Sequence, residues 1–338
     1  MIYFEAKQII KKCLLAKLPC FIWGGPGIGK SSCVREICDE ENTELFDIRL
    51  SLLDPTDLRG LPFPNKTRGI VEWLVPDFLP PSNSKQKIVL FLDEFNCAPK
   101  QVQMASLQLL LDRKLGNYIL PENAAIIAAG NREEDMAFVN ILSSAVCNRL
   151  VHIHLNPDID SWTNWAVSHN ILPEIVGFLN FRPELLFKLT GEKSFPSPRT
   201  WVMASELINK TKITDIKEIK TIISCCVGDG VMSEFISWYK NYKDIDVKSI
   251  LQGKYPDLES KNASYKYAII IALGYYLQNH GFKNSEANIA NFLKLFNPEY
   301  RVLFLKALKK EELVRQLCMH KSMKEMASQI LKVTIGEI

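Results

Sequence analysis

The stretch from Gly24 to Ser31 constrains this chain more than any other part of it. It reads Gly-Gly-Pro-Gly-Ile-Gly-Lys-Ser and satisfies the phosphate-binding pattern G-x-x-x-x-G-K-[ST] at every position. Glycines let the backbone curl so that several N–H groups converge on phosphate oxygens, and a following helix adds the positive end of its dipole. The apolar residues Cys20–Trp23 before the loop predict a buried strand, and the residues after it predict a helix.

The loop residues have distinct expected roles in holding ATP. We expect the ammonium group of Lys30 to reach the β- and γ-phosphates, and the hydroxyl of Ser31 to bind Mg²⁺. The residues expected to line the nucleotide are Gly25, Pro26, Gly27, Ile28, Gly29, Lys30, Ser31 and Ser32.

A second motif supports the same chemistry. Five apolar residues, Ile88–Leu92, predict a buried strand, and the carboxylates of Asp93 and Glu94 follow at its carboxyl end. Open α/β sheets bind their ligands at that end of the strands. We expect Asp93 to hold Mg²⁺ through its waters and Glu94 to polarise the attacking water.

The order of apolar and helical patterns predicts the fold class. Short strand-like runs alternate with helical patterns up to about residue 156, which indicates an α/β, doubly wound parallel sheet of the P-loop NTPase kind. From residue 157 to 338 helical spacing dominates, which predicts an all-α lid followed by a helical C-terminal region. The predicted strands are Cys20–Trp23, Leu45–Leu50, Ile88–Leu92, Ala124–Ala129 and Leu150–Leu155.

One proline-rich segment, at about residues 54–84, does not fit a plain sheet. Its apolar side chains, such as Phe63 and Trp73, are too frequent for a free linker. A Lys66–Gly69 turn lies between two short apolar segments. We expect an ordered insertion built as a hairpin with a helix.

Composition excludes several classes of protein. The net charge of +3, from 41 basic and 38 acidic side chains, does not favour nucleic acid as a partner. The nine cysteines show no CxxC spacing, so we expect neither a disulfide framework nor a zinc framework. We therefore expect the protein to reside in a reducing cytoplasm. The longest apolar run, Ala268–Leu277, is too short to span a membrane, and the N-terminus shows no signal pattern.

Other polar residues follow later predicted strands. Asn131 ends the fourth strand, where its amide could orient a water beside the γ-phosphate. Arg149 follows the helical run Phe138–Asn148, where it could touch a neighbouring subunit's nucleotide. Arg199 is a further candidate for an arginine that contacts a nucleotide. His152 and His154 share one face of the fifth strand, but no third metal ligand is in sight.

Together these residues resemble the AAA+ ATPases, and within them the MoxR family, over about residues 4–210. Gly24–Ser31 is similar to Walker A, and Asp93-Glu94 to Walker B. The resemblance implies that the catalytic set comprises Glu94, Asn131 as sensor 1, Arg149 as arginine finger and Arg199 as sensor 2, the last acting in its own or the adjacent site. It also implies that Ser31 and Asp93 hold the metal.

Further matches and one departure bear on the resemblance. Leu53–Gly60 resembles the start of the family's helix-2 insertion, and Leu115–Leu120 the hairpin before sensor 1. Where the family commonly has Asp-Arg-Phe around the finger, this chain has Asn148-Arg149-Leu150. The arginine is kept, so the resemblance still implies its role.

The resemblance implies a function as well. It is Mg²⁺-dependent ATP hydrolysis by a homo-oligomer, a hexameric ring, that remodels or activates a protein partner in a chaperone-like way. Such partners often carry a von Willebrand factor A domain. Two alternatives stay open at this point: a DNA-directed motor or loader, and an ATP-gated scaffold without turnover. The intact Glu94, Asn131 and Arg149 argue against the scaffold, because it has no need of a hydrolytic set.

Overall fold

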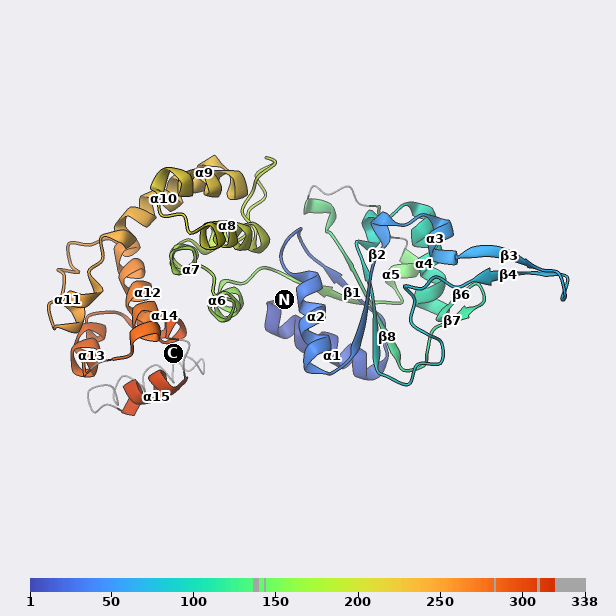
Figure 1. The fold of residues 1–338 in the computed structure, drawn as a ribbon, viewed down its shortest axis with the longest axis horizontal. Helices are drawn as coiled ribbons and strands as arrows, with labels where there is room; N and C mark the ends of the chain where they lie inside the picture. The colour runs from blue at the N-terminus through green and yellow to red at the C-terminus, as the bar shows by residue number, and fades with distance from the viewer. Residues whose placement is uncertain (136–139, 143, 283, 309–310, 320–338) are drawn as a thin grey trace. The chain divides into compact units, whose positions relative to one another are not determined.

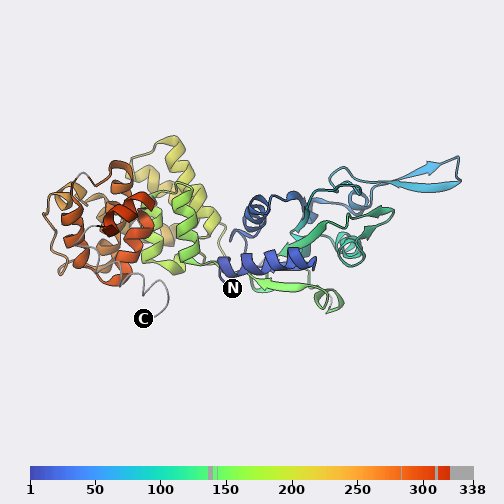
Figure 2. The ribbon, with the colours of Figure 1, turned by 90° about the horizontal axis from the view of Figure 1, so that it is seen from below.

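A computed structural model describes residues 1–135, 140–142, 144–282, 284–308 and 311–319 of the chain. It divides into two compact units, Met1–Pro157 and Asp158–Ile338. Figures 1 and 2 show the ribbon of each unit: the first combines a sheet with helices, and the second is built from helices throughout its described residues.

A five-stranded parallel sheet organises the first unit, in the order β2-β5-β8-β1-β9. The central strands β5 and β8 are buried along their whole length, as expected for a parallel sheet covered on both faces. The predicted strands agree with these five to within one residue at each end. The strands are β1 (Cys20–Trp23), β2 (Glu44–Arg49), β5 (Ile88–Asp93), β8 (Ala124–Gly130) and β9 (Val151–His154).

Helices bury the two faces of this sheet. Leu90 and Leu92 of β5 join a core cluster with Val102 and Leu109 of the helix Lys100–Asp112. Val89 and Phe91 point to the opposite face of the sheet and are equally buried. The helices and short 3₁₀ turns of this unit are α1 (Tyr3–Ala16), α2 (Lys30–Glu40), η1 (Leu50–Leu52), α3 (Pro55–Arg59), η2 (Phe95–Cys97), α4 (Lys100–Asp112), η3 (Glu133–Asp135) and α5 (Ser144–Cys147).

The helix expected over Phe138–Asn148 is much shorter in the described residues. Only the turn Ser144–Cys147 is helical there, and residues 136–139 and 143 lie outside the described part of the chain. A small hairpin, β6 (Lys114–Leu115) and β7 (Tyr118–Ile119), forms where the Leu115–Leu120 region had been expected to make one.

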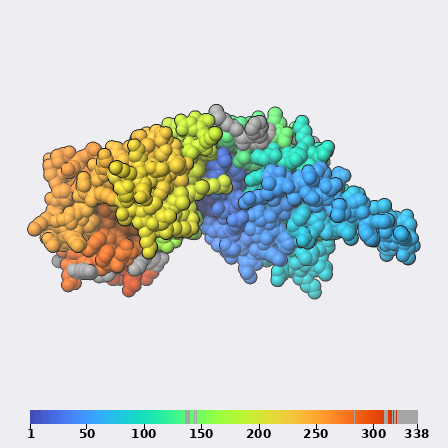
Figure 3. Space-filling model, turned by 45° about the horizontal axis from the view of Figure 1, so that its top comes forward, coloured from blue at the N-terminus to red at the C-terminus, as the bar shows by residue number. Residues whose placement is uncertain are grey.

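The expected insertion forms a short helix and a protruding hairpin. The helix α3 leads into β3 (Leu61–Asn65), which pairs antiparallel with β4 (Ile70–Leu74). Both faces of this hairpin are largely exposed, and it stands out from the body of the first unit in the space-filling view of Figure 3. In the turn, the side-chain oxygen of Asn65 accepts hydrogen bonds from the backbone N–H groups of Thr67 and Arg68, both at 3.1 Å.

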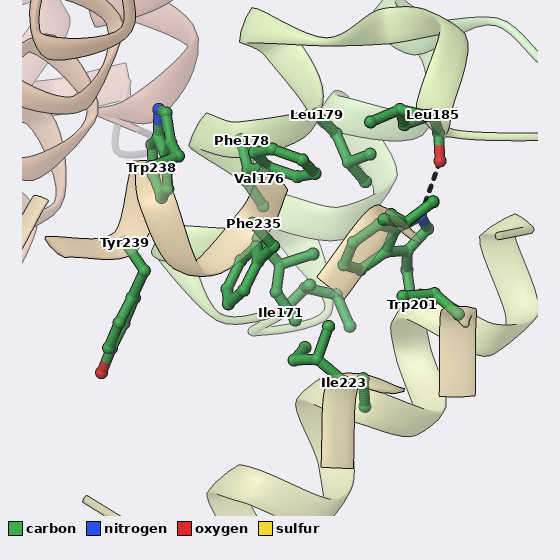
Figure 4. Close-up of a cluster of buried hydrophobic side chains, with 14 of the residues drawn as sticks. Ile171, Val176, Phe178, Leu179, Leu185, Trp201, Ile223, Phe235, Trp238 and Tyr239 are labelled. Atoms are coloured by element: carbon green, nitrogen blue, oxygen red, sulfur yellow. Dashed lines mark hydrogen bonds between the residues drawn. The ribbon is translucent and has the colours of Figure 1, made fainter. Parts of the chain in front are cut away.

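The second unit packs its helices around two hydrophobic clusters. The first cluster centres on aromatic side chains, among them Phe178, Trp201 and Phe235 (Figure 4). The indole N–H of Trp201 donates to the carbonyl of Leu185 at 2.8 Å, so this fully buried ring keeps its polar atom satisfied. The second cluster lies toward the C-terminus and includes Phe292 and Phe304.

The described helices of the second unit follow one another without a strand between them. They are α6 (Ile159–Ser168), α7 (Pro173–Phe181), η4 (Pro183–Leu185), α8 (Pro198–Thr211), α9 (Ile216–Val227), α10 (Asp229–Lys243), α11 (Val247–Leu251), α12 (Ala263–His280), α13 (Glu286–Lys294), α14 (Pro298–Ala307) and α15 (Glu311–Met319). Among the described helices, none is both long and apolar enough to cross a membrane.

Candidate nucleotide site

The candidate site lies where the carboxyl ends of three neighbouring strands meet the start of α2. The loop after β1, the end of β5 and the end of β8 each supply polar side chains there: Lys30, Asp93 and Asn131. Neighbouring parallel strands end at the same edge of a sheet, so residues far apart in the sequence come within hydrogen-bond distance. This edge is the region that the two sequence motifs predict.

The loop Gly24–Gly29 wraps around the start of α2. Gly29 caps the helix with φ of 100°, in the left-handed region that favours glycine, which explains the glycine before Lys30. The helix then runs for 11 residues, with the backbone N–H groups of its first turn beside the loop. Such a helix start favours anionic groups, because the aligned peptide dipoles place partial positive charge there.

Lys30 connects the loop to the strand next to it. Its ammonium group donates to the carbonyl oxygens of Gly24 and Gly25, at 2.6 and 3.0 Å, and to the Oδ1 atom of Asn131, at 2.9 Å. The side chain is buried, with 9% of its surface exposed. A buried ammonium at a helix start attracts anionic groups strongly, so these residues fit the phosphates of ATP.

Ser31 and Asp93 bring two hard oxygen donors together. The hydroxyl of Ser31 donates to a carboxylate oxygen of Asp93 at 2.6 Å, and Asp93 is 7% exposed. Mg²⁺ prefers oxygen ligands and usually keeps several waters beside one or two protein groups and the substrate phosphates. The donor set therefore fits a magnesium ion held together with a nucleotide.

Glu94 has an unusual backbone and a specific side-chain partner. Its φ is +55°, in the left-handed region that a non-glycine residue rarely adopts, and its backbone N–H donates to Asp93 at 2.8 Å. Its carboxylate accepts a hydrogen bond from the hydroxyl of Ser51, in the 3₁₀ turn after β2. Sequence reasoning missed Ser51, because nothing in the sequence indicates that this turn lies beside β5.

Asn131 is held through both its backbone and its side chain. The side chain of Asn96 makes two hydrogen bonds to the backbone of Asn131. The amide nitrogen of Asn96 donates to the Asn131 carbonyl at 2.7 Å, and the amide oxygen accepts from the Asn131 N–H at 3.1 Å. The Asn131 side chain in turn donates to the sulfur of Cys97 at 3.5 Å. Burial raises the pKa of the Cys97 thiol, and the nearby Glu94 adds to the effect.

Asn96 is the second residue that sequence reasoning missed. It is 1% exposed, and its own backbone carbonyl accepts from the N–H of Asn140 at 2.7 Å. An asparagine three residues after Asp93 is a weak signal in itself. Its two bonds to Asn131 span 35 positions of sequence and become visible only in the fold.

The arginine candidates lie in different surroundings. Arg149 follows α5 in a short turn and is exposed. Arg132 bonds to Asp135 and Asn156, at 3.1 and 3.2 Å, and so is held within the first unit. Arg199 is exposed in the first turn of α8, on the second unit. Ser32, the last expected nucleotide contact, is exposed at the start of α2.

Comparison with known families identifies this part of the chain. Residues 20–155 match the family model of the AAA ATPases, described as the ATPase family associated with various cellular activities. Those residues run from β1 to the end of β9 and contain every site residue of the first unit. They form an ATPase domain of the AAA type, whose substrate is ATP with Mg²⁺ as its usual partner. No curated protein matches the chain.

The solved structures that match this chain are distant from it in sequence. NtrX from Brucella abortus in complex with ATP is 16% identical, with 86% of this chain and 64% of that chain covered and a TM-score of 0.44. The RuvB Holliday junction branch migration motor from Thermotoga maritima is 13% identical, with coverage of 86% and 74% and a TM-score of 0.35. A candidate ATPase from Cytophaga hutchinsonii is 24% identical, with 46% of this chain covered, a TM-score of 0.34, and a match over about half its own length (48%).

Proposed function

We propose that the whole protein hydrolyses ATP with Mg²⁺ and uses the energy to remodel or activate a protein partner, in the manner of the MoxR family. The observation that carries the ATPase part is a pair of hydrogen bonds, one from Lys30 to Asn131 and one from Ser31 to Asp93. Four residue types that phosphoryl transfer needs are thereby assembled at one edge of the sheet.

Each residue has a role in this proposal. Lys30 binds the β- and γ-phosphates, while Ser31 and Asp93 would hold the magnesium ion, whose charge stabilises the transferring phosphoryl group. Glu94 takes a proton from the attacking water. Asn131 orients that water, because its amide is fixed in direction by the bonds to Lys30 and Cys97.

The test compares two substitutions that separate binding from chemistry. Lys30→Ala should abolish ATP binding, since it removes the buried charge that meets the phosphates. Glu94→Gln should bind ATP like the wild type and lose turnover, because it removes only the water-polarising carboxylate. Glu122→Gln, at an exposed glutamate of the same unit, is the control and should keep both. Wild-type turnover in Glu94→Gln would overturn the catalytic assignment.

The hairpin β3–β4 supports the partner part of the proposal. Leu61, Phe63 and Leu74 are 64%, 58% and 58% exposed. Apolar side chains gathered on a protruding element mark a surface that another protein covers. The hairpin offers only two cations to a nucleic acid, Lys66 and Arg68. Of these, Arg68 already pairs with Glu72 at 3.3 Å.

The hairpin is tested by removing its apolar surface while keeping its backbone. Leu61, Phe63, Ile70 and Leu74 lie on one face by register, so changing Phe63 and Leu74 to Ser removes half of its apolar side chains. We expect basal ATP turnover to survive, and its stimulation by a protein with a von Willebrand factor A domain to fall. Leu295→Ser, at an equally exposed leucine of the second unit, is the control. Unchanged stimulation would exclude the hairpin as the contact, and loss of single-stranded DNA binding instead would favour a DNA-directed motor.

The assembly and location are part of the same proposal. AAA+ ATPases commonly form oligomeric rings, and we propose a hexamer in which Arg149 acts on the nucleotide of the adjacent subunit. Its exposure leaves the guanidinium accessible to such a neighbour. Arg199, exposed on α8, is proposed as a second arginine at the nucleotide, in its own or the adjacent subunit. The eight cysteines whose side chains the structure describes are all free thiols, which supports a reducing cytoplasm.

A further inference from the structure

A chain of hydrogen bonds runs from the phosphate-binding loop to the turn that carries Arg149. It begins at Trp23, the last residue of β1, whose indole N–H donates to the Nδ1 atom of His152 at 2.8 Å. The other ring nitrogen of His152, Nε2, lies 2.8 Å from the carbonyl oxygen of Cys147. Trp23 directly precedes Gly24, whose carbonyl binds the ammonium group of Lys30.

The two bonds of His152 fix how its ring is protonated. The indole of Trp23 can only donate, so Nδ1 must be the acceptor and must carry no proton. Nε2 therefore carries the proton and donates it to Cys147. Because both ring nitrogens are hydrogen-bonded, the imidazole of His152 bridges the end of β1 and the end of α5.

Cys147 sets the position of the turn that follows α5. Its carbonyl accepts from the N–H of Leu150, at 3.2 Å, as well as from His152. The N–H of Arg149 donates to the Val146 carbonyl at 3.0 Å, so the backbone on both sides of Arg149 is tied down. The helix α5 is only four residues long and contributes little rigidity of its own. The imidazole of His152 supplies a fixed point that so short a helix lacks.

We propose that His152 is a positioning residue for Arg149, and that it aims this arginine at the nucleotide of the adjacent subunit. The proposal rests on the trans role of Arg149 proposed above. His152 does not touch the nucleotide. It acts through the Cys147 carbonyl, and through Trp23 it ties the arginine-bearing turn to the strand that leads into the phosphate-binding loop of its own subunit.

The test is His152→Phe, which keeps a planar ring in the space and removes both hydrogen bonds. We expect ATP affinity to stay close to the wild-type value, because Lys30, Ser31 and Asp93 are untouched. Turnover at saturating ATP should fall on the order of 10- to 100-fold, the cost of a catalytic group displaced by about 1 Å. His154→Phe makes the same change two residues along the strand, at a ring that stacks on Trp23 without a bond to Cys147, and should keep wild-type turnover.

Mixed assemblies separate positioning from a structural defect. Subunits with His152→Phe keep their own Glu94, and subunits with Glu94→Gln keep a well-placed Arg149. Co-assembly of the two should raise turnover severalfold above the sum of the separate preparations, because an intact Arg149 then serves the His152→Phe site. A variant that had merely distorted its own phosphate-binding loop would gain nothing from such a neighbour. Wild-type turnover in His152→Phe, or no gain on mixing, overturns the proposal.

A parallel mixture shows which idea has failed. Arg149→Ala combined with Glu94→Gln tests the trans arginine itself. If this pair recovers turnover while His152→Phe does not, the arginine acts in trans and the positioning role of His152 is wrong. If the Arg149→Ala pair fails to recover, the trans assignment of Arg149 is wrong, and the role of His152 is rejected with it.

Discussion

Replacing Asn96 by alanine should weaken the support of the nucleotide site, while every residue proposed to contact the nucleotide stays unchanged in sequence. The Asn96 side chain is 1% exposed and makes two hydrogen bonds to the backbone of Asn131, at 2.7 and 3.1 Å. Asn96→Ala removes both partners at once. The carbonyl and the N–H of Asn131 are then left without the groups that satisfy them.

The expected cost follows from those two bonds. A buried polar group that loses its partner costs about 1–3 kcal/mol, so the pair amounts to roughly 2–4 kcal/mol once some solvent access is allowed for. Since about 1.4 kcal/mol is a factor of ten, hydrogen exchange of the Asn131 amide should accelerate on the order of 10²-fold. Turnover should fall as well, because the amide that orients the attacking water loses its support.

Hydrogen exchange followed by mass spectrometry measures this directly on the peptide that contains Asn131. A peptide from β1 provides an internal reference for global unfolding, and Asn117→Ala, at an exposed asparagine of the β6–β7 turn, provides the control substitution. Asn96→Asp keeps the hydrogen-bond acceptor and loses the donor, so its Asn131 exchange rate should lie between those of the wild type and Asn96→Ala. Unchanged exchange at Asn131 in Asn96→Ala, with wild-type turnover, would refute the reasoning.

Two further predictions concern close packing and burial. Gly130→Ala should destabilise the first unit by about 1–3 kcal/mol, because a Cβ atom there would lie 2.3 Å from the Oδ1 atom of Asn96 and 2.8 Å from the ring of Phe21; urea unfolding followed on β8 amides checks this. Burial raises the pKa of Glu174, so its contribution to stability is present below the pKa of the unfolded chain and is lost as pH rises through the higher folded value. Glu174→Gln should therefore reduce the loss of stability of the second unit as pH rises above the pKa of an unfolded glutamate, about 4, measured as urea midpoints against pH.

The sequence could predict those features whose cause is local. The strand Ile88–Asp93 is a continuous apolar run, and the Gly24–Ser31 loop needs its residue types at fixed spacing, so both are legible without a fold. The hairpin in the insertion was expected from the turn residues Lys66–Gly69 between apolar segments. The helix before Arg149 was expected to be longer than the described turn Ser144–Cys147, because apolar periodicity carries no information on where capping ends a helix.

Contacts across the sheet edge could not be predicted, because they depend on which strands are neighbours. Asn96 and Asn131 meet only because β5 lies next to β8, and Ser51 meets Glu94 only because β2 lies next to β5. Polar residues just beyond strand ends are common in turns, so none of these supporting positions differs in sequence from an ordinary loop residue.

The contact between Ser51 and Glu94 offers a physical route by which ATP hydrolysis could be coupled to partner binding at the hairpin. Ser51 belongs to the turn Leu50–Leu52, which leads through α3 directly into β3 of the exposed hairpin. A change in the partner of the Glu94 carboxylate would therefore act on the segment that anchors the hairpin. The same carboxylate is proposed to take a proton from the attacking water, so it cannot serve the water and Ser51 equally. Competition between the two partners links the step of hydrolysis to the base of the surface proposed to engage the protein partner.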